Sequence, residues 1–176
     1  MIQVAYYTIP SAIVLIGVYF LISRFLQEES TRLELLFKQS IIKQNQKISL
    51  PIRYQAYERL ALLLERMHPL QVISRHPVAG LSAKDYKNQL ILDINTEYQY
   101  NLTQQVYVSS EIWQLIIQIK EQMQILYNEI YSALPQDSYA EKMSDAIIEY
   151  VNSTSKEKIP TYVGLKYLKN EVAKTY

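Results

Sequence analysis

The stretch that decides the fold is SEIWQLIIQIKEQMQILYNEIYSA, residues 110–133. Its apolar residues recur at alternating spacings of four and three, which places their side chains on one face of an α-helix. Other apolar residues widen that face, as expected for the central helix of a bundle. A coiled-coil seam between chains is the alternative that such a rhythm leaves open. The stripe consists of Ile112, Ile116, Ile119, Met123, Leu126, Ile130 and Ala133.

Shorter apolar stripes with helical spacing occur on both sides of this segment. They predict helices at about 31–45, 50–68, 82–98, 138–151 and 160–172, with a polar break at 44–49. Capping boxes are expected at Thr31 and Ser138, and an N-cap at Ser82. Only three glycines occur, which disfavours strands joined by tight turns. The soluble part is therefore predicted to be all-α, an antiparallel bundle of four to six helices.

The first 23 residues contain no charged side chain, and Arg24 follows them. Roughly 20 such residues match the thickness of the hydrocarbon core of a bilayer. A cleaved signal peptide is the alternative, but the basic n-region and small-residue cleavage site that it needs are missing. The chain is thus expected to have a single transmembrane helix in an anchor at residues 1–29 and a soluble helical domain at residues 30–176.

Lysine and arginine residues follow the predicted span but do not precede it. Such a bias predicts that the N-terminus lies outside and the soluble domain in the cytoplasm. These residues are Arg24, Arg32, Lys38, Lys43, Lys47 and Arg53.

Several classes of function find no support in the composition. The net charge of +1 gives no case for binding nucleic acid. The absence of cysteine excludes thiol nucleophiles, zinc ribbons and disulfides. Gly80 and Gly164 are too isolated to form a phosphate-binding loop. Glu65 and His68 are one half of a di-iron motif whose second half is missing, so neither a metal nor a cofactor is predicted.

Polar residues gather where the helix after Ser82 should be most apolar. Glu97, Asn101, Gln104 and Gln105 follow one another at spacings that put them on one helical face, and polar residues of the preceding helix are expected to meet them. Two interpretations stay open: a polar pocket, or a hydrogen-bonded network between helices or a solvated face. The candidate face consists of Arg53, Tyr57, Glu58, Arg59, Glu97, Asn101, Gln104, Gln105 and Tyr107.

Tyrosine is abundant, with 16 residues in the chain. Its large apolar ring and polar tip suit protein interfaces, although tyrosines at helical spacing also serve as core residues.

Two segments give the chain a resemblance. They are PIRYQAYERL at residues 51–60, followed by LER at 64–66, and EYQYNLTQQVYVS at residues 97–109, followed by Trp113. In these segments the chain resembles a family of small bacterial proteins of the Bacteroidota type with one N-terminal membrane span and no known reaction. The resemblance implies a bacterial inner-membrane setting and carries over no catalytic residue.

The expected function is that of a membrane-anchored, non-enzymatic interaction or accessory subunit of a membrane-associated complex. The alternative is a membrane-bound helical enzyme or ligand-binding domain that uses the polar face. The expected partners are the lipid bilayer and other membrane protein subunits, and a homo-oligomer stays open. These expectations rest on the anchor, the helices, the tyrosines and the lack of a chemical motif.

Overall fold

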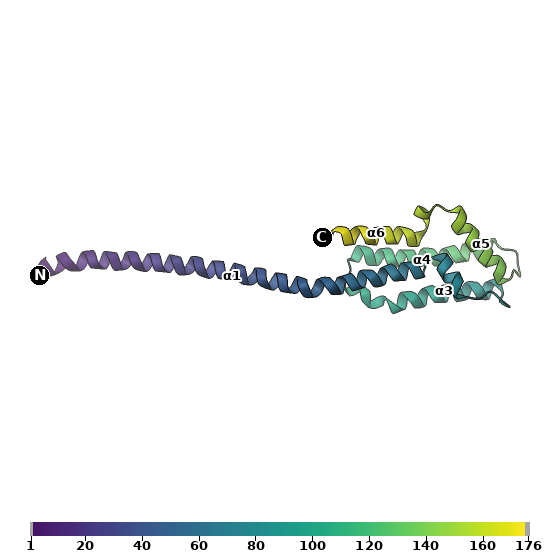
Figure 1. The fold of residues 1–176 in the computed structure, drawn as a ribbon, viewed down its shortest axis with the longest axis horizontal. Helices are drawn as coiled ribbons and strands as arrows, with labels where there is room; N and C mark the ends of the chain where they lie inside the picture. Colours follow the sequence, from purple (N-terminus) through teal and green to yellow (C-terminus); the bar gives the residue numbers. More distant parts are fainter. Residues whose placement is uncertain (1, 175–176) are drawn as a thin grey trace. The chain divides into compact units, whose positions relative to one another are not determined.

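The computed structural model describes the backbone of residues 2–174 and the side chains of residues 14–45 and 47–174. Within these limits the chain is all-α and contains no strand, which confirms the all-α part of the predicted fold class (Figure 1). The α-helices are α1 (Ile2–Arg66), α2 (Pro69–Arg75), α3 (Ala83–Tyr100), α4 (Ser110–Ala133), α5 (Ala140–Ser153) and α6 (Pro160–Lys174). Two 3₁₀ helices, η1 (Leu102–Val106) and η2 (Lys156–Lys158), join neighbouring helices.

The chain forms two compact units, residues 1–50 and residues 51–176. The predicted break at 44–49 is wrong as a helix end, because α1 continues through it. Its residues other than Ile48 are polar, yet none is a glycine or a proline, so nothing in the segment stops a helix. The Thr31 capping box is also wrong, since Thr31 lies inside α1 and its hydroxyl donates to the carbonyl of Gln27 at 2.9 Å.

Among the residues with described side chains, no helix is long and apolar enough to cross a membrane. Residues 1–13 of the predicted anchor lie outside those residues.

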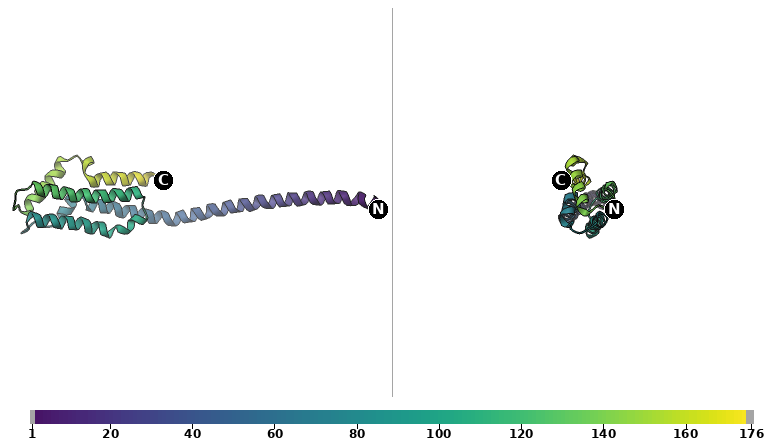
Figure 2. Two further views of the ribbon diagram at one scale, coloured as in Figure 1. Left: turned by 180° about the vertical axis from the view of Figure 1, so that it is seen from behind. Right: turned by 90° about the vertical axis from the view of Figure 1, so that its right-hand side faces the viewer.

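The second unit is a helical bundle with one apolar core. The last part of α1, from residue 51, lies alongside α3, α4 and α6, while α5 crosses the end at which α2 also lies (Figures 1 and 2). Each of these helices contributes buried apolar side chains, and α2 does so through Val72. They include Leu60, Leu64, Met67, Leu90, Ile94, Ile116, Ile119, Met123, Met143, Ile147 and Leu168.

Helix α4 lies at the centre of this core, as its wide stripe predicts. The stripe is buried from Ile112 to Leu126, whereas Ile130 is half-buried and Ala133 is exposed. Trp113 widens the buried face and stacks on Tyr98 of α3, with ring centroids 5.5 Å apart. Because α3, α5 and α6 all pack on this helix, its stripe is a core face within the chain.

Two predicted N-caps have different outcomes. Ser82 caps α3, since its Oγ accepts from the backbone N–H of Asp85 at 3.1 Å. The Ser138 capping box is wrong, because Ser138 Oγ donates to the carbonyl of Pro135 at 2.7 Å and α5 starts two residues later. The Ser138 backbone is used elsewhere: its carbonyl accepts from Ala83 N–H at 2.8 Å.

Candidate functional site

The predicted polar face divides between two places in the bundle. One part surrounds Glu97 at the end of α3, and the other surrounds Tyr57 on α1. Helix α3 ends at Tyr100, and η1 follows, so Gln104 and Gln105 do not continue the face that carries Glu97. Gln104 donates to the hydroxyl of Thr103 at 3.2 Å, and Gln105 is exposed. The expected single face is therefore not formed.

Glu97 is a buried carboxylate, with 8% of its surface exposed. Its Oε1 accepts from Arg66 Nε at 2.7 Å, and Arg66 Nη2 contacts the same oxygen. Asn101 donates its side-chain amide to the backbone carbonyl of Glu97 at 2.9 Å, which ends α3. The hydrogen bond to Glu97 raises the pKa of Arg66, which stabilises the charged pair.

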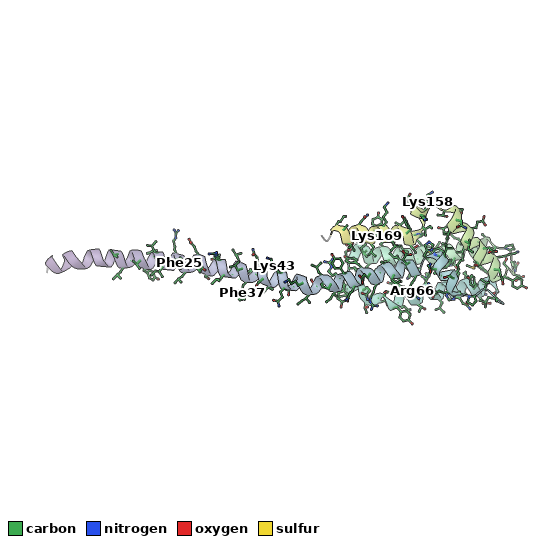
Figure 3. The ribbon with its side chains drawn as sticks, viewed as in Figure 1. Phe25, Phe37, Lys43, Arg66, Lys158 and Lys169 are labelled. Atoms are coloured by element: carbon green, nitrogen blue, oxygen red, sulfur yellow. The ribbon has the colours of Figure 1, made fainter. Side chains whose placement is uncertain are left out.

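A groove of about 300 Å³ lies beside this ion pair. Its walls come from α1 and from the C-terminal end of α3. Arg66, labelled in Figure 3, belongs to the groove although the candidate face did not include it. In the sequence analysis Arg66 stands only in the segment LER at 64–66, which carries the resemblance, and not in the candidate face. The lining residues are Arg59, Leu62, Leu63, Arg66, Glu97, Tyr100 and Asn101.

Large apolar and aromatic side chains are exposed in the segment that follows Glu97, one of the residues that line this groove. Tyr100 is 76% exposed and Val106 is 75% exposed, and Leu102 and Tyr107 are also exposed. We call these four residues the η1 surface. Leu102 and Val106 lie on η1, which has no buried residue, while Tyr100 ends α3 and Tyr107 follows η1.

The second part of the predicted face is a structural hydrogen-bond chain. Tyr57 is buried, and its hydroxyl donates to Glu171 Oε1 at 2.7 Å while accepting from Arg53 Nη2 at 3.4 Å. Ser109 Oγ donates to Glu171 Oε2 at 2.8 Å. Burial, and then the hydrogen bond to Glu171, raises the pKa of Tyr57. These hydrogen bonds thus link α1, α6 and the N-cap of α4 to one another.

Glu58 lies apart from this hydrogen-bond chain, on the rim of an apolar pocket. The pocket measures about 260 Å³ and lies between α1 and α6. It is lined by Tyr54, Tyr57, Glu58, Ala61, Leu168, Lys169 and Val172.

The half motif Glu65–His68 has a local structural role. His68 is the N-cap of α2, and its Nδ1 accepts from the backbone N–H of Leu70 at 3.3 Å. Burial lowers the pKa of His68, so its neutral form is favoured. Among the described residues no group of three or more His, Asp or Glu side chains is placed to hold a metal ion.

The fold and its two polar clusters define an all-α protein with a groove and an apolar surface beside an ion pair. The chain belongs to the Family of unknown function (DUF7935), whose profile matches residues 1–175. Membership in a family without a known reaction was expected from the resemblance, and it is confirmed. No curated protein and no solved structure matches the chain.

Proposed function

We propose that this protein is a membrane-anchored, non-enzymatic interaction subunit that works beside a larger membrane complex. The observation that carries the proposal is the η1 surface, where four large side chains of a short segment meet water. Clustered apolar side chains at a surface mark interaction sites, whereas scattered ones are ordinary. The resemblance supports a bacterial inner membrane as the setting of this subunit.

The composition around η1 is that of a protein interface. Tyrosine and arginine are enriched in interface cores and at the positions that dominate binding energy. Tyr100 lines the groove beside Arg59 and Arg66, and Tyr107 follows at the end of η1. A partner residue that enters the groove would bury apolar surface and meet the guanidinium of Arg59, which is exposed.

The anchor is proposed from the sequence of residues 1–29. In the described part of this segment, Val14, Leu15 and Ile16 are each more than half exposed. Consecutive residues point about 100° apart, so the helix is apolar all round, a pattern that belongs in lipid or in a core. The lysine and arginine bias after Ser23 supports an outside N-terminus and a cytoplasmic bundle.

The ligand-binding or enzymatic alternative has less support. The groove lies at the lower end of the volumes typical of ligand pockets. The only carboxylate in its lining, Glu97, is already bonded to Arg66. We therefore favour the interaction role.

The test is copurification of the full-length protein from its own membrane in mild detergent, with quantitative comparison of the recovered partners. The variants Tyr100→Ala and Val106→Asp are expected to lose specific partners. Tyr139→Ala is the matched control, because Tyr139 is 70% exposed and lies on another part of the bundle. Identical partner sets for all three variants and the unaltered chain would contradict the proposal.

A further inference from the structure

Helix α1 carries an apolar repeat of eleven residues in the first unit. Leu15, Leu26, Phe37 and Ile48 follow one another at this interval, and each is at least 60% exposed. Eleven residues correspond to three turns of 3.67 residues, close to the natural pitch of an α-helix. These four side chains therefore form an almost straight line along α1.

Two further sets of apolar residues widen the line on either side. Ile22 and Leu33 are again eleven residues apart, and Ile41 lies four residues after Phe37. Positions four residues apart are neighbours on one helical face. We call the seven residues the α1 stripe: Leu15, Ile22, Leu26, Leu33, Phe37, Ile41 and Ile48, all exposed.

Charged residues avoid the α1 stripe. Arg24, Arg32 and Lys43 lie on other sides of the helix, and Lys43 is about 120° round α1 from Phe37. Only Glu29 and Glu34 border the stripe closely, and Glu34 pairs with Lys38 of its own helix at 2.8 Å.

We propose that the α1 stripe binds the same stripe of a second copy of this chain, with the two helices parallel. A straight stripe with an eleven-residue period fits best against a helix of the same period, which a second copy supplies. Two chains that share one orientation in a membrane are parallel and in register. The parallel arrangement rests on the proposed anchor.

The area of the contact supports a pair that depends on tethering. Beyond the proposed span, five stripe residues per chain face water: Leu26, Leu33, Phe37, Ile41 and Ile48. Ten such side chains in a pair bury on the order of 600–1,200 Å², at roughly 60–120 Å² each. Specific interfaces need about 1,000 Å², so the contact is marginal for free chains. Confinement to a membrane raises the local concentration and favours the pair.

The experiment uses disulfide cross-linking, because the chain has no cysteine of its own. Leu33→Cys and Leu35→Cys are introduced singly into the full-length protein in its membrane, which is then oxidised and run on a non-reducing gel. Leu33 is 52% exposed and Leu35 is 57% exposed, but Leu35 lies about 200° further round the helix. We expect a dimer band from Leu33→Cys at least tenfold stronger than from Leu35→Cys. No dimer from Leu33→Cys, or equal dimer from both, would overturn the proposal.

A second pair of variants tests whether apolar contact holds the chains together. In the Leu33→Cys background, Ile41→Asp should abolish the dimer band, whereas Ile42→Asp should leave it. Ile42 is 56% exposed against 52% for Ile41, but lies about 100° further round the helix, outside the stripe. Equal effects of the two variants would contradict the proposal that the α1 stripe forms the contact between the two copies.

Sedimentation of the same samples separates this proposal from the proposed anchor. A chain that pellets with the membrane but shows no Leu33→Cys dimer refutes the pairing alone. A chain recovered in the supernatant refutes the anchor, and its cross-linking pattern still reports on the stripe.

Discussion

Arg66 on α1 binds Glu97 on α3 through two guanidinium nitrogens that converge on one carboxylate oxygen. The Nε contact measures 2.7 Å and joins residues 31 positions apart in the sequence. Glu97 is buried, and a buried carboxylate is costly unless it is paired. This pair therefore fixes the end of α3 against α1 and shapes the groove next to η1.

Removal of the guanidinium of Arg66 should destabilise the bundle. Arg66→Ala leaves Glu97 buried without its partner, and we expect the free energy of unfolding to fall by about 1–2 kcal/mol. The side chain of Arg66 is 44% exposed, so water replaces part of the lost bond. Urea denaturation of the full-length protein measures the change through Trp113, the only tryptophan and a core residue. Arg59→Ala, at an exposed position, should change the stability by less than about 0.5 kcal/mol.

Two buried tyrosines should respond in opposite ways to removal of the hydroxyl. Tyr57→Phe loses the hydrogen bond to Glu171 and should destabilise the bundle by about 1 kcal/mol. Tyr127 is fully buried, and its hydroxyl has no hydrogen-bond partner among the described residues. Tyr127→Phe should therefore be neutral or stabilising, by up to about 1 kcal/mol. Thermal unfolding of both variants checks this, and a large loss for Tyr127→Phe would be inconsistent with the structure.

Acid should weaken the bundle through His68. Burial lowers the pKa of His68 below its ordinary 6.5, with a smaller opposing effect from Glu65. The folded state therefore binds this proton less readily than the unfolded state does. The resulting contribution to stability is present above about pH 6.5 and is lost as the pH falls. His68→Asn keeps a residue that caps helices but does not titrate. Between about pH 7 and pH 5 the free energy of unfolding should fall more steeply for the unaltered chain than for His68→Asn. Parallel curves for the two proteins would refute the role of His68 in the acid sensitivity.

The close packing of α6 against α1 and α4 should require a glycine at position 164. A Cβ atom at this position would lie 2.4 Å from Ile119 Cδ1 and 3.1 Å from Leu64 Cδ2. Gly164→Leu should destabilise the bundle by about 1–3 kcal/mol, because α6 must move away from α1 and α4. Gly17→Leu is the control, since a Cβ atom there meets nothing within 4 Å. Similar denaturation midpoints for the two variants would show that α6 does not pack as closely as described.

The helices could be predicted where apolar periodicity is long. The α4 stripe fixed the central helix, and the 160–172 stripe indicated α6, which covers Pro160–Lys174. Boundaries that depend on local chemistry were less secure. Thr31 has the spacing of a capping box, yet no glycine or proline stands near it and most neighbours favour helix, so α1 passes through it. Ser138 fails as a cap because its Oγ donates to the carbonyl of Pro135. Its backbone carbonyl bonds to Ala83, a tertiary contact that no local pattern reveals.

The candidate site was predicted in part. Glu97 and Asn101 do lie together, and Arg59 reaches the same groove. Arg66 was missed because its pairing depends on how α1 packs against α3. Gln104 and Gln105 were assigned to the helical face of Glu97, but α3 ends at Tyr100 and a 3₁₀ helix follows, so they do not continue that face. The core role predicted for the tyrosines is confirmed for Tyr57 and Tyr127, whereas Tyr100 is exposed and its interface role stays a prediction.

Extraction of whole membranes with alkaline carbonate tests the central claim most directly, since it strips peripheral proteins and leaves embedded ones. The intact polypeptide should stay in the pellet, and a variant without residues 2–23 should move to the supernatant with its bundle still folded by Trp113 fluorescence. If the intact polypeptide leaves the lipid together with that shortened variant, the account of a tethered subunit is contradicted.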